Sequence, residues 1–255
     1  MSPYELHHQV EGPAETPAIV LLGSLGSDLS MWVPQVEALR GELRVVCLDS
    51  RGHGGSPVPP GPYTVADLGG DVLATLAALG IERASLCGVS LGGSIALWVA
   101  ANAPERVRRL VICFSSAFYG GREAWLARAA LVRAEGTDVV ADAVVGRWFT
   151  PALAERNPEL VARMRAMIAV TPAEGYAGCC EALAEFDLRD ELSRITAPTL
   201  VLAGEDDPAT PPEHGQRIAA GISGARFVAI PAAAHLGCLE RPEVVTELIR
   251  QHLGQ

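Results

Sequence analysis

The residues Gly88-Val89-Ser90-Leu91-Gly92 match the pattern G-x-S-x-G, at a point where an apolar run gives way to a helix-like run. A serine at the tip of a sharp strand-to-helix turn projects its hydroxyl from the backbone, where it can act as a nucleophile. Glycine two positions before and after the serine leaves room for such a tight turn. The pattern alone also fits a loop serine that caps the following helix, so a catalytic role requires partners elsewhere in the chain.

A serine hydroxyl is a weak nucleophile at neutral pH and needs a histidine base, which itself needs a carboxylate to orient it. Asp207 lies in an acidic loop after the apolar run Thr199–Ala203, and the neighbouring Asp206 is the alternative. His235 lies in the loop after the apolar run Arg226–Ile230. Taken alone, the acidic loop would be an ordinary surface turn. The order serine, acid, histidine on successive loops predicts a catalytic triad of Ser90, Asp207 and His235.

Two backbone amides are expected to stabilise the negative charge that develops on the attacked carbonyl oxygen. One is the amide of Leu91, which follows the nucleophile at the start of a helix whose dipole assists. The other is the amide of Leu25, which lies between Gly23 and Gly26 in the sequence. These glycines allow the backbone to approach a substrate closely. His53 precedes the serine in the chain and is expected to be a loop-bracing residue.

The elements that must position these residues follow from the apolar pattern. Short runs of valine, isoleucine and leucine with little alternation are typical of parallel strands buried on both faces. Their alternation with helix-like segments predicts an α/β fold with a doubly wound, mostly parallel sheet. The predicted strands are Ala18–Leu22, Arg44–Leu48, Ala84–Cys87, Arg109–Phe114, Thr199–Ala203 and Arg226–Ile230. The predicted helices are Leu29–Arg40, Val65–Leu79, Leu91–Ala101, Glu213–Ala220 and Glu243–Leu253.

One interval interrupts this alternation. Residues 119–190 contain no convincing strand and read as helices separated by breakers at Gly136, Pro151, Pro158 and Pro172. We expect a helical lid here, inserted after the sixth strand and lying over the carboxyl ends of the strands. The chain would then divide into a core of residues 1–118 and 191–255 and a helical cap of residues 119–190. The aromatic residues of this interval would mostly pack within the cap itself.

The composition of the chain argues against several classes of partner and site. The formal net charge of −10 argues against nucleic acid as a partner and leaves no basic face for a membrane. The chain has no apolar run of membrane-spanning length, and its start resembles no signal peptide, so a cytoplasmic protein is predicted. The six cysteines form no C-x-x-C pair, which favours free core thiols over a metal site.

The chain resembles the α/β-hydrolase fold family along essentially its whole length, and resembles the 3-oxoadipate enol-lactonases most closely. The segments that carry the resemblance are Ser24–Trp32, Asp49–Ser56, Gly88–Gly93, Gly204–Pro212, Arg147–Pro151, Thr171–Cys180 and Ala234–Leu236. Gly23 departs from the family pattern, in which a residue with a side chain opens the oxyanion loop.

The resemblance implies hydrolysis of a small enol lactone with an acetate arm to 3-oxoadipate, in the catabolism of aromatic compounds and without a metal or organic cofactor. The free carboxylate of this anionic substrate needs a donor, and arginine offers bidentate geometry. Arg147, beside Trp148 in the lid, and Arg51 are the candidates. The alternatives are that Arg51 braces its own loop and that Arg147 is a solvated helix residue.

Two other functions remain open on the same residues. One is a related lidded carboxylesterase, or a carbon–carbon bond hydrolase of ring-cleavage products, with the same triad. The other is a ligand-binding protein that keeps the fold and the pocket but does not catalyse a reaction. The sequence does not predict an oligomeric state.

Overall fold

A seven-stranded sheet forms the centre of the computed structural model, which describes residues 2–254. Its strands are β1 (His8–Glu11), β2 (Ala18–Leu22), β3 (Arg44–Leu48), β4 (Ala84–Val89), β5 (Val107–Cys113), β6 (Thr199–Gly204) and β7 (Arg226–Ile230). Their order is β1-β3-β2-β4-β5-β6-β7. The pairing of β1 with β3 is antiparallel, and the other described pairs are parallel. The predicted mostly parallel, doubly wound sheet is confirmed.

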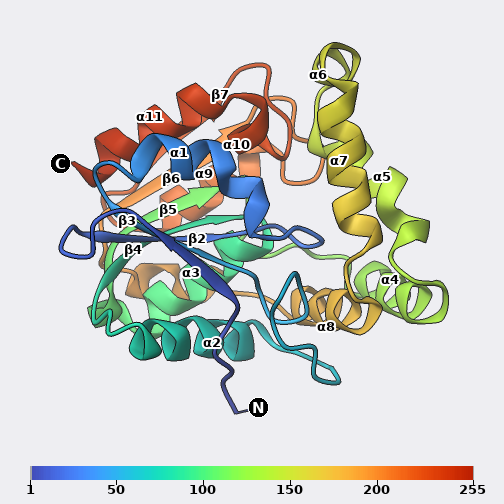
Figure 1. Ribbon diagram of the computed structural model, residues 1–255, viewed down its shortest axis with the longest axis horizontal. Coiled ribbons are helices and arrows are strands. Elements are labelled where there is room, and N and C mark those ends of the chain that lie inside the picture. The colour runs from blue at the N-terminus through green and yellow to red at the C-terminus, as the bar shows by residue number, and fades with distance from the viewer. Residues whose placement is uncertain (1, 255) are drawn as a thin grey trace.

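Helices cover both faces of this sheet, and a further group of helices lies beyond one end of its strands (Figure 1). They are η1 (Leu29–Trp32), α1 (Val33–Leu39), α2 (Val65–Ala78), α3 (Leu91–Asn102), η2 (Pro104–Arg106), α4 (Arg122–Glu135), α5 (Asp138–Trp148), α6 (Pro151–Arg156), α7 (Pro158–Ala169), α8 (Ala173–Ala184), η3 (Arg189–Arg194), α9 (Pro212–Gly221), α10 (Gly237–Glu240) and α11 (Pro242–Leu253). Helices α1 and α11 pack together over one face, whereas α2 and α3 lie on the other (Figure 1). Helices on both faces explain why β2 and β4 are buried along their whole length.

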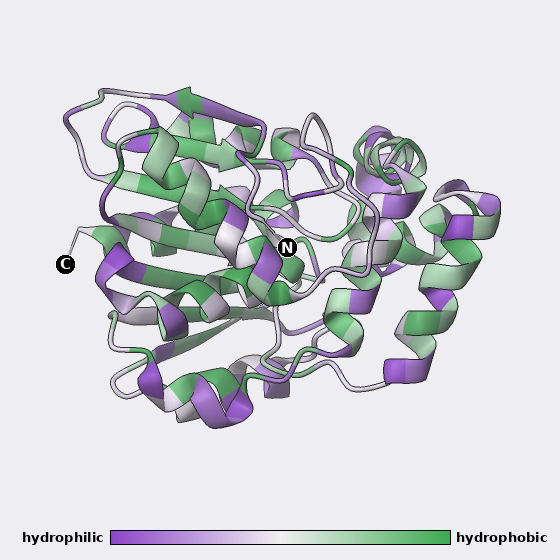
Figure 2. Ribbon diagram, turned by 90° about the horizontal axis from the view of Figure 1, so that it is seen from below, coloured by the Kyte–Doolittle hydropathy of each residue, from purple (hydrophilic) through white to green (hydrophobic). Residues whose placement is uncertain are grey.

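The apolar colours of Figure 2 gather in the strands and on the helix faces turned toward them. All six cysteines are buried and free, as predicted. Cys87 on β4 and Cys113 on β5 are neighbours, with their sulfur atoms 3.9 Å apart. Among residues 2–254, no helix is both long enough and apolar enough to span a bilayer.

Helices α4 to α8 lie to one side of the sheet, beyond the carboxyl ends of its parallel strands (Figure 1). The predicted breakers separate them: α4 ends before Gly136, which has a φ of +86°, and Pro151 and Pro158 are the first residues of α6 and α7. The insertion follows β5, the fifth strand and not the predicted sixth, because a single antiparallel strand precedes β2. The division into a core and a cap at residues 119 and 190 stays a prediction.

Helix α8 meets the loop after β3 by direct contact of backbone with backbone. A Cβ atom on Gly52 would lie 2.3 Å from the Cα of Gly175, and one on Gly175 would lie 2.1 Å from the carbonyl oxygen of Gly52. Gly52 also has a φ of +80°, which favours glycine. The Gly61 amide donates a hydrogen bond to Glu174 at 2.7 Å. The N-terminal half of α8 is therefore fastened to the sheet domain.

Candidate active site

Ser90 occupies the turn between β4 and α3. Its φ of +54° and ψ of −116° fall outside the regions that non-glycine residues normally adopt, which is a feature of functional turns. Its two flanking glycines are required sterically. A Cβ atom on Gly88 would lie 2.2 Å from the Gly92 carbonyl oxygen, and one on Gly92 would lie 2.2 Å from the Leu22 carbonyl oxygen. The G-x-S-x-G spacing thus forms the sharp strand-to-helix turn that the sequence predicted.

Asp207 and His235 are in direct contact, and both are buried. His235 Nδ1 lies 2.9 Å from Asp207 Oδ2. The carboxylate also accepts hydrogen bonds from the Thr210 hydroxyl at 2.7 Å and from the amides of Thr210 and Ala209. Asp206, the alternative acid, is exposed. Burial acts to raise the pKa of Asp207, but the attraction of His235 and the hydrogen bonds outweigh burial and lower it, which keeps the carboxylate ionised.

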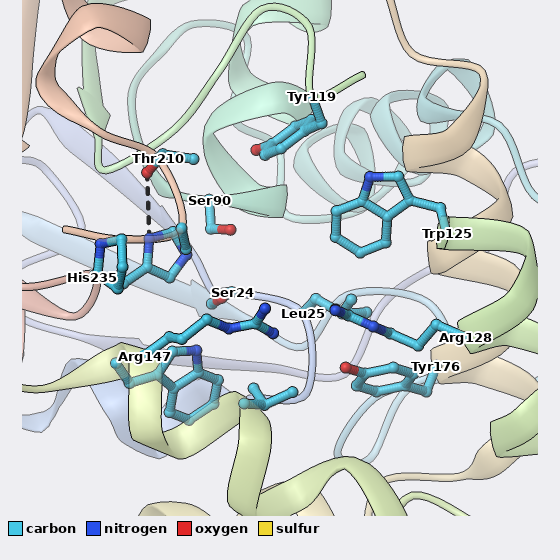
Figure 3. A pocket seen from close by; sticks show the side chains of 14 residues that line it. Ser24, Leu25, Ser90, Tyr119, Trp125, Arg128, Arg147, Tyr176, Thr210 and His235 are labelled. Atoms are coloured by element: carbon cyan, nitrogen blue, oxygen red, sulfur yellow. Dashed lines mark hydrogen bonds between the residues drawn. The ribbon is translucent and has the colours of Figure 1, made fainter. Parts of the chain in front are cut away.

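Ser90 and His235 line the same cavity, where their side chains lie next to each other (Figure 3). Because Nδ1 of the imidazole is engaged with Asp207, its Nε2 is the nitrogen left to accept a proton from a serine. The structure therefore brings together the serine, histidine and acid that the sequence selected. Their catalytic roles stay a prediction until activity is measured.

The two predicted oxyanion amides come from adjoining stretches of backbone. The Gly92 amide donates to the Gly23 carbonyl oxygen at 3.0 Å, which joins the start of α3 to the loop after β2. Leu91 is the first residue of α3, and the first amides of a helix have no acceptor within it. Leu25 lines the cavity. Donation by both amides to a substrate oxygen stays a prediction.

His53 holds the loop of Leu25 in place, as expected. The Gly26 amide donates to its Nε2 at 2.9 Å, and its Nδ1 lies 3.2 Å from the Arg51 carbonyl oxygen. The Ser27 hydroxyl donates to the Ser24 carbonyl oxygen at 2.8 Å, and a Cβ atom on Gly23 would lie 2.6 Å from this hydroxyl oxygen. Burial lowers the pKa of His53, so the ring stays neutral and can accept the Gly26 hydrogen bond.

This lowered pKa makes the stability of the protein dependent on pH. Unfolded His53 takes up a proton below about pH 6.5, whereas the folded residue resists protonation, so the free energy of unfolding should fall as the pH drops. One such residue contributes up to about 1.4 kcal/mol per pH unit. His53→Gln can still accept the Gly26 hydrogen bond and should remove this contribution. Denaturant unfolding of both proteins between pH 7.5 and 5.5 checks this prediction. If the free energy of unfolding depends equally on pH in both proteins, the prediction is contradicted.

The prediction that Arg51 contacts substrate is wrong. Its guanidinium is fully buried and forms two hydrogen bonds with the carboxylate of Asp71, at 2.6 and 2.7 Å. It also lies over the rings of Tyr4 and Tyr63, at 4.9 and 5.4 Å. These contacts hold the side chain in the interior and away from the cavity. The alternative, a brace for the loop, is the one the structure supports.

Arg147 and Trp148, at the end of α5, both line the cavity, which has a volume of about 160 Å³. Arg147 is half-buried, so it is not simply a solvated helix residue. Sequence reasoning missed Arg128, whose guanidinium lies 4.8 Å from the centre of the Trp125 ring. The available clue was the three-residue spacing of these two on α4, which places them on one helix face. Other lining residues missed from the sequence are Tyr119, Tyr176, Thr210 and Val144.

Glu240 connects the histidine loop with the inserted helices. Its buried carboxylate accepts the Ala234 amide at 2.8 Å and both the amide and the hydroxyl of Thr150, at the start of α6. The Leu236 amide donates to the Trp148 carbonyl oxygen at 2.9 Å. The residues on both sides of His235 are therefore held by the segment between α5 and α6.

Comparisons with known proteins agree with this geometry. The family model described as alpha/beta hydrolase fold matches residues 17–242. The chain is 40% identical to 3-oxoadipate enol-lactonase 2 of Acinetobacter baylyi, over 96% of this chain and 91% of the relative. It is similar to the crystal structure of the enol-lactonase from Burkholderia xenovorans, with a TM-score of 0.96 and 42% identity over 98% of this chain and 96% of that one. A thermophilic esterase from Thermogutta terrifontis, solved with malate bound, superimposes with a TM-score of 0.93 at 33% identity, over 97% and 92% of the two chains.

Proposed function

Because the chain belongs to the α/β-hydrolase fold family and is a hydrolase of carboxylic esters, we propose that it opens 3-oxoadipate enol-lactone to 3-oxoadipate. The observation that carries the proposal is one cavity in which Ser90 and His235 face an arginine, Arg147. A reactive ester carbonyl and a free carboxylate are the two groups that such a cavity would hold at once. The relatives named enol-lactonases, and a neighbour solved with a dicarboxylate, support the same substrate class.

In the first half of the reaction, the Ser90 hydroxyl oxygen attacks the lactone carbonyl carbon while His235 Nε2 takes its proton. The resulting oxyanion accepts hydrogen bonds from the Leu25 and Leu91 amides, which need no reorganisation to reach it. Asp207 stabilises the charged imidazolium through Nδ1. When the tetrahedral intermediate collapses, the bond between the carbonyl carbon and the ring oxygen breaks, and the ring oxygen leaves as an enol.

The leaving ring oxygen has become an enol by taking the proton from His235, and in the second half this enol tautomerises to a ketone. The ketone is a poor nucleophile, so the ring does not close again. Water then enters, loses a proton to His235 and attacks the acyl-enzyme on Ser90. The second collapse returns the proton to the serine and releases a carboxylate. The proposed route needs only water and the side chains and amides named here.

Arg147 is proposed to hold the free carboxylate of the lactone. Replacing it with alanine should raise KM for the lactone about tenfold or more, because a charge-assisted hydrogen bond of about 1.5–3 kcal/mol is lost. KM for a neutral p-nitrophenyl ester should change far less, since that substrate carries no carboxylate. Steady-state kinetics on both substrates check this, and equal increases would assign Arg147 another role.

The test of the function is a direct assay with the enol lactone, generated in situ from muconolactone, beside a series of p-nitrophenyl esters. We expect kcat/KM for the lactone to exceed that for the esters. The second candidate, a carboxylesterase, is favoured by the likeness to the Thermogutta esterase. An inert lactone with rapid ester cleavage would establish that candidate instead.

A further inference from the structure

A second arginine, Arg128, enters the cavity from the side opposite Arg147. It lies on α4 and is stacked against Trp125 at 4.8 Å, which restricts its side chain. Figure 3 shows the two guanidinium groups converging from opposite sides of the cavity, near Leu25, with the Tyr176 hydroxyl turned toward them. Two cations therefore converge in one small space of a protein whose net charge is −10.

The surroundings of these two arginines differ from those of other arginines on the inserted helices. Arg122 is paired with Glu185 at 2.6 Å, Arg133 with Glu174 at 2.8 Å, and Arg165 with Asp142 at 2.8 Å. Within residues 2–254, neither Arg128 nor Arg147 has a carboxylate at ion-pair distance. Arg122, Arg133 and Arg165 are thus neutralised by the protein, whereas the two arginines that face the cavity are not.

The lack of a counter-charge has an energetic cost that an anion would relieve. Burial lowers the pKa of Arg147 and the nearby Arg128 lowers it further. The Tyr176 hydroxyl is buried beside them, and burial raises its pKa while both arginines oppose that effect. Like charges in a partly dehydrated cavity repel each other, and a carboxylate placed between them would convert this repulsion into charge-assisted hydrogen bonds.

We propose that Arg128 and Arg147 form a paired receptor for one carboxylate of a short aliphatic dicarboxylate. The other carboxylate of the ligand lies between Ser90 and the amides of Leu25 and Leu91, where hydrolysis of an ester would leave it. Arg128 is then a determinant of specificity that acts on the end of the ligand remote from the reaction. The inference deepens the proposed function, because opening a lactone with an acidic arm yields a dicarboxylate that the same receptor retains.

The test is calorimetric titration of the Ser90→Ala protein with succinate, glutarate and adipate, each beside the monocarboxylate of equal chain length. At least one dicarboxylate should bind ten times more tightly than its monocarboxylate partner, or better. Arg128→Gln in the same background should weaken that binding about tenfold or more, because a bidentate donor is lost. Arg122→Gln, on the same helix but paired with Glu185 at the surface, is the matched control and should leave binding unchanged.

Arg128→Lys keeps the positive charge, so a change in binding in this variant does not arise from loss of the charge. It should weaken binding less than Arg128→Gln does. Equal binding of dicarboxylates and monocarboxylates, or dicarboxylate binding that neither Arg128 variant changes, would overturn the receptor. The same experiments distinguish failure of the receptor from failure of the proposed function. If dicarboxylates bind but the lactone is not hydrolysed, the proposed function is refuted and the proposed receptor stands. If the lactone is hydrolysed rapidly but dicarboxylates do not bind, the receptor is refuted and the function stands.

Discussion

Replacing Ser90 with alanine should lower kcat by a factor of about 10⁴ to 10⁶, because the reaction loses its nucleophile and retains only the oxyanion donors and substrate binding. KM should change little, since the hydroxyl contributes mainly to bond formation. Steady-state kinetics with the lactone measure the loss. Lactone hydrolysis at an undiminished rate in a folded Ser90→Ala protein would refute the mechanism.

A labelling experiment separates Ser90 from the other serine of the cavity, Ser24. A fluorophosphonate probe reacts with an activated serine hydroxyl, so it should label the unaltered protein and fail to label Ser90→Ala. The Ser24→Ala variant should still be labelled, because Ser90, at the strained turn between β4 and α3, is the proposed nucleophile and is unchanged in that variant. Loss of label only in Ser24→Ala would place the nucleophile in the loop after β2.

The second large effect is expected at Asp207. Replacing it with asparagine should lower kcat by about 10⁴, because the amide can no longer stabilise the imidazolium and favours the wrong tautomer of His235. The change is nearly isosteric, and the remaining oxygen can still accept the Ala209 and Thr210 amides, while the Thr210 hydroxyl can accept from the new amide nitrogen. The loss should therefore appear in kcat far more than in KM or in thermal stability.

Asp206→Asn is the matched control for this change. Asp206 carries the same functional group one residue earlier in the same loop, but it is exposed. Its replacement should alter kcat less than twofold. A large effect at Asp206 with a small one at Asp207 would reassign the acid and would mean that the loop is displaced during the reaction.

The elements that sequence reasoning located well are those determined by neighbouring residues. The strands Ala18–Leu22, Arg44–Leu48 and Arg226–Ile230 have the predicted bounds, because each is a continuous apolar run that ends at a change in the local sequence. The first two are buried, whereas Arg226–Ile230 lies at the edge of the sheet and is only partly buried. The turn at Ser90 could be predicted because the two glycines that it requires lie within the same five-residue segment. The acid and the base could be placed because parallel strands deliver their following loops to one edge of the sheet.

The side chains that were missed or misplaced depend on contacts between distant segments. Arg51 is buried because Asp71, twenty residues later, closes over it with two hydrogen bonds, which no local pattern reveals. Arg128 shares its helix with Arg122 and Arg133, and only the packing of α4 against α8 decides which of the three faces the cavity. Spacing within the helix places Arg128 on the same face as Trp125, but it does not show that this face turns toward the cavity.

The backbone contact between Gly52 and Gly175 has a consequence for engineering and for divergence within the family. The two glycines are more than a hundred residues apart in the sequence, yet a side chain at either position would collide with the backbone of the other. Exchange of helices α4 to α8 with those of a relative would therefore require glycine at the position of Gly175 in the donor and at the position of Gly52 in the recipient. We expect such chimaeras to fold only when both parent chains share this pair of glycines.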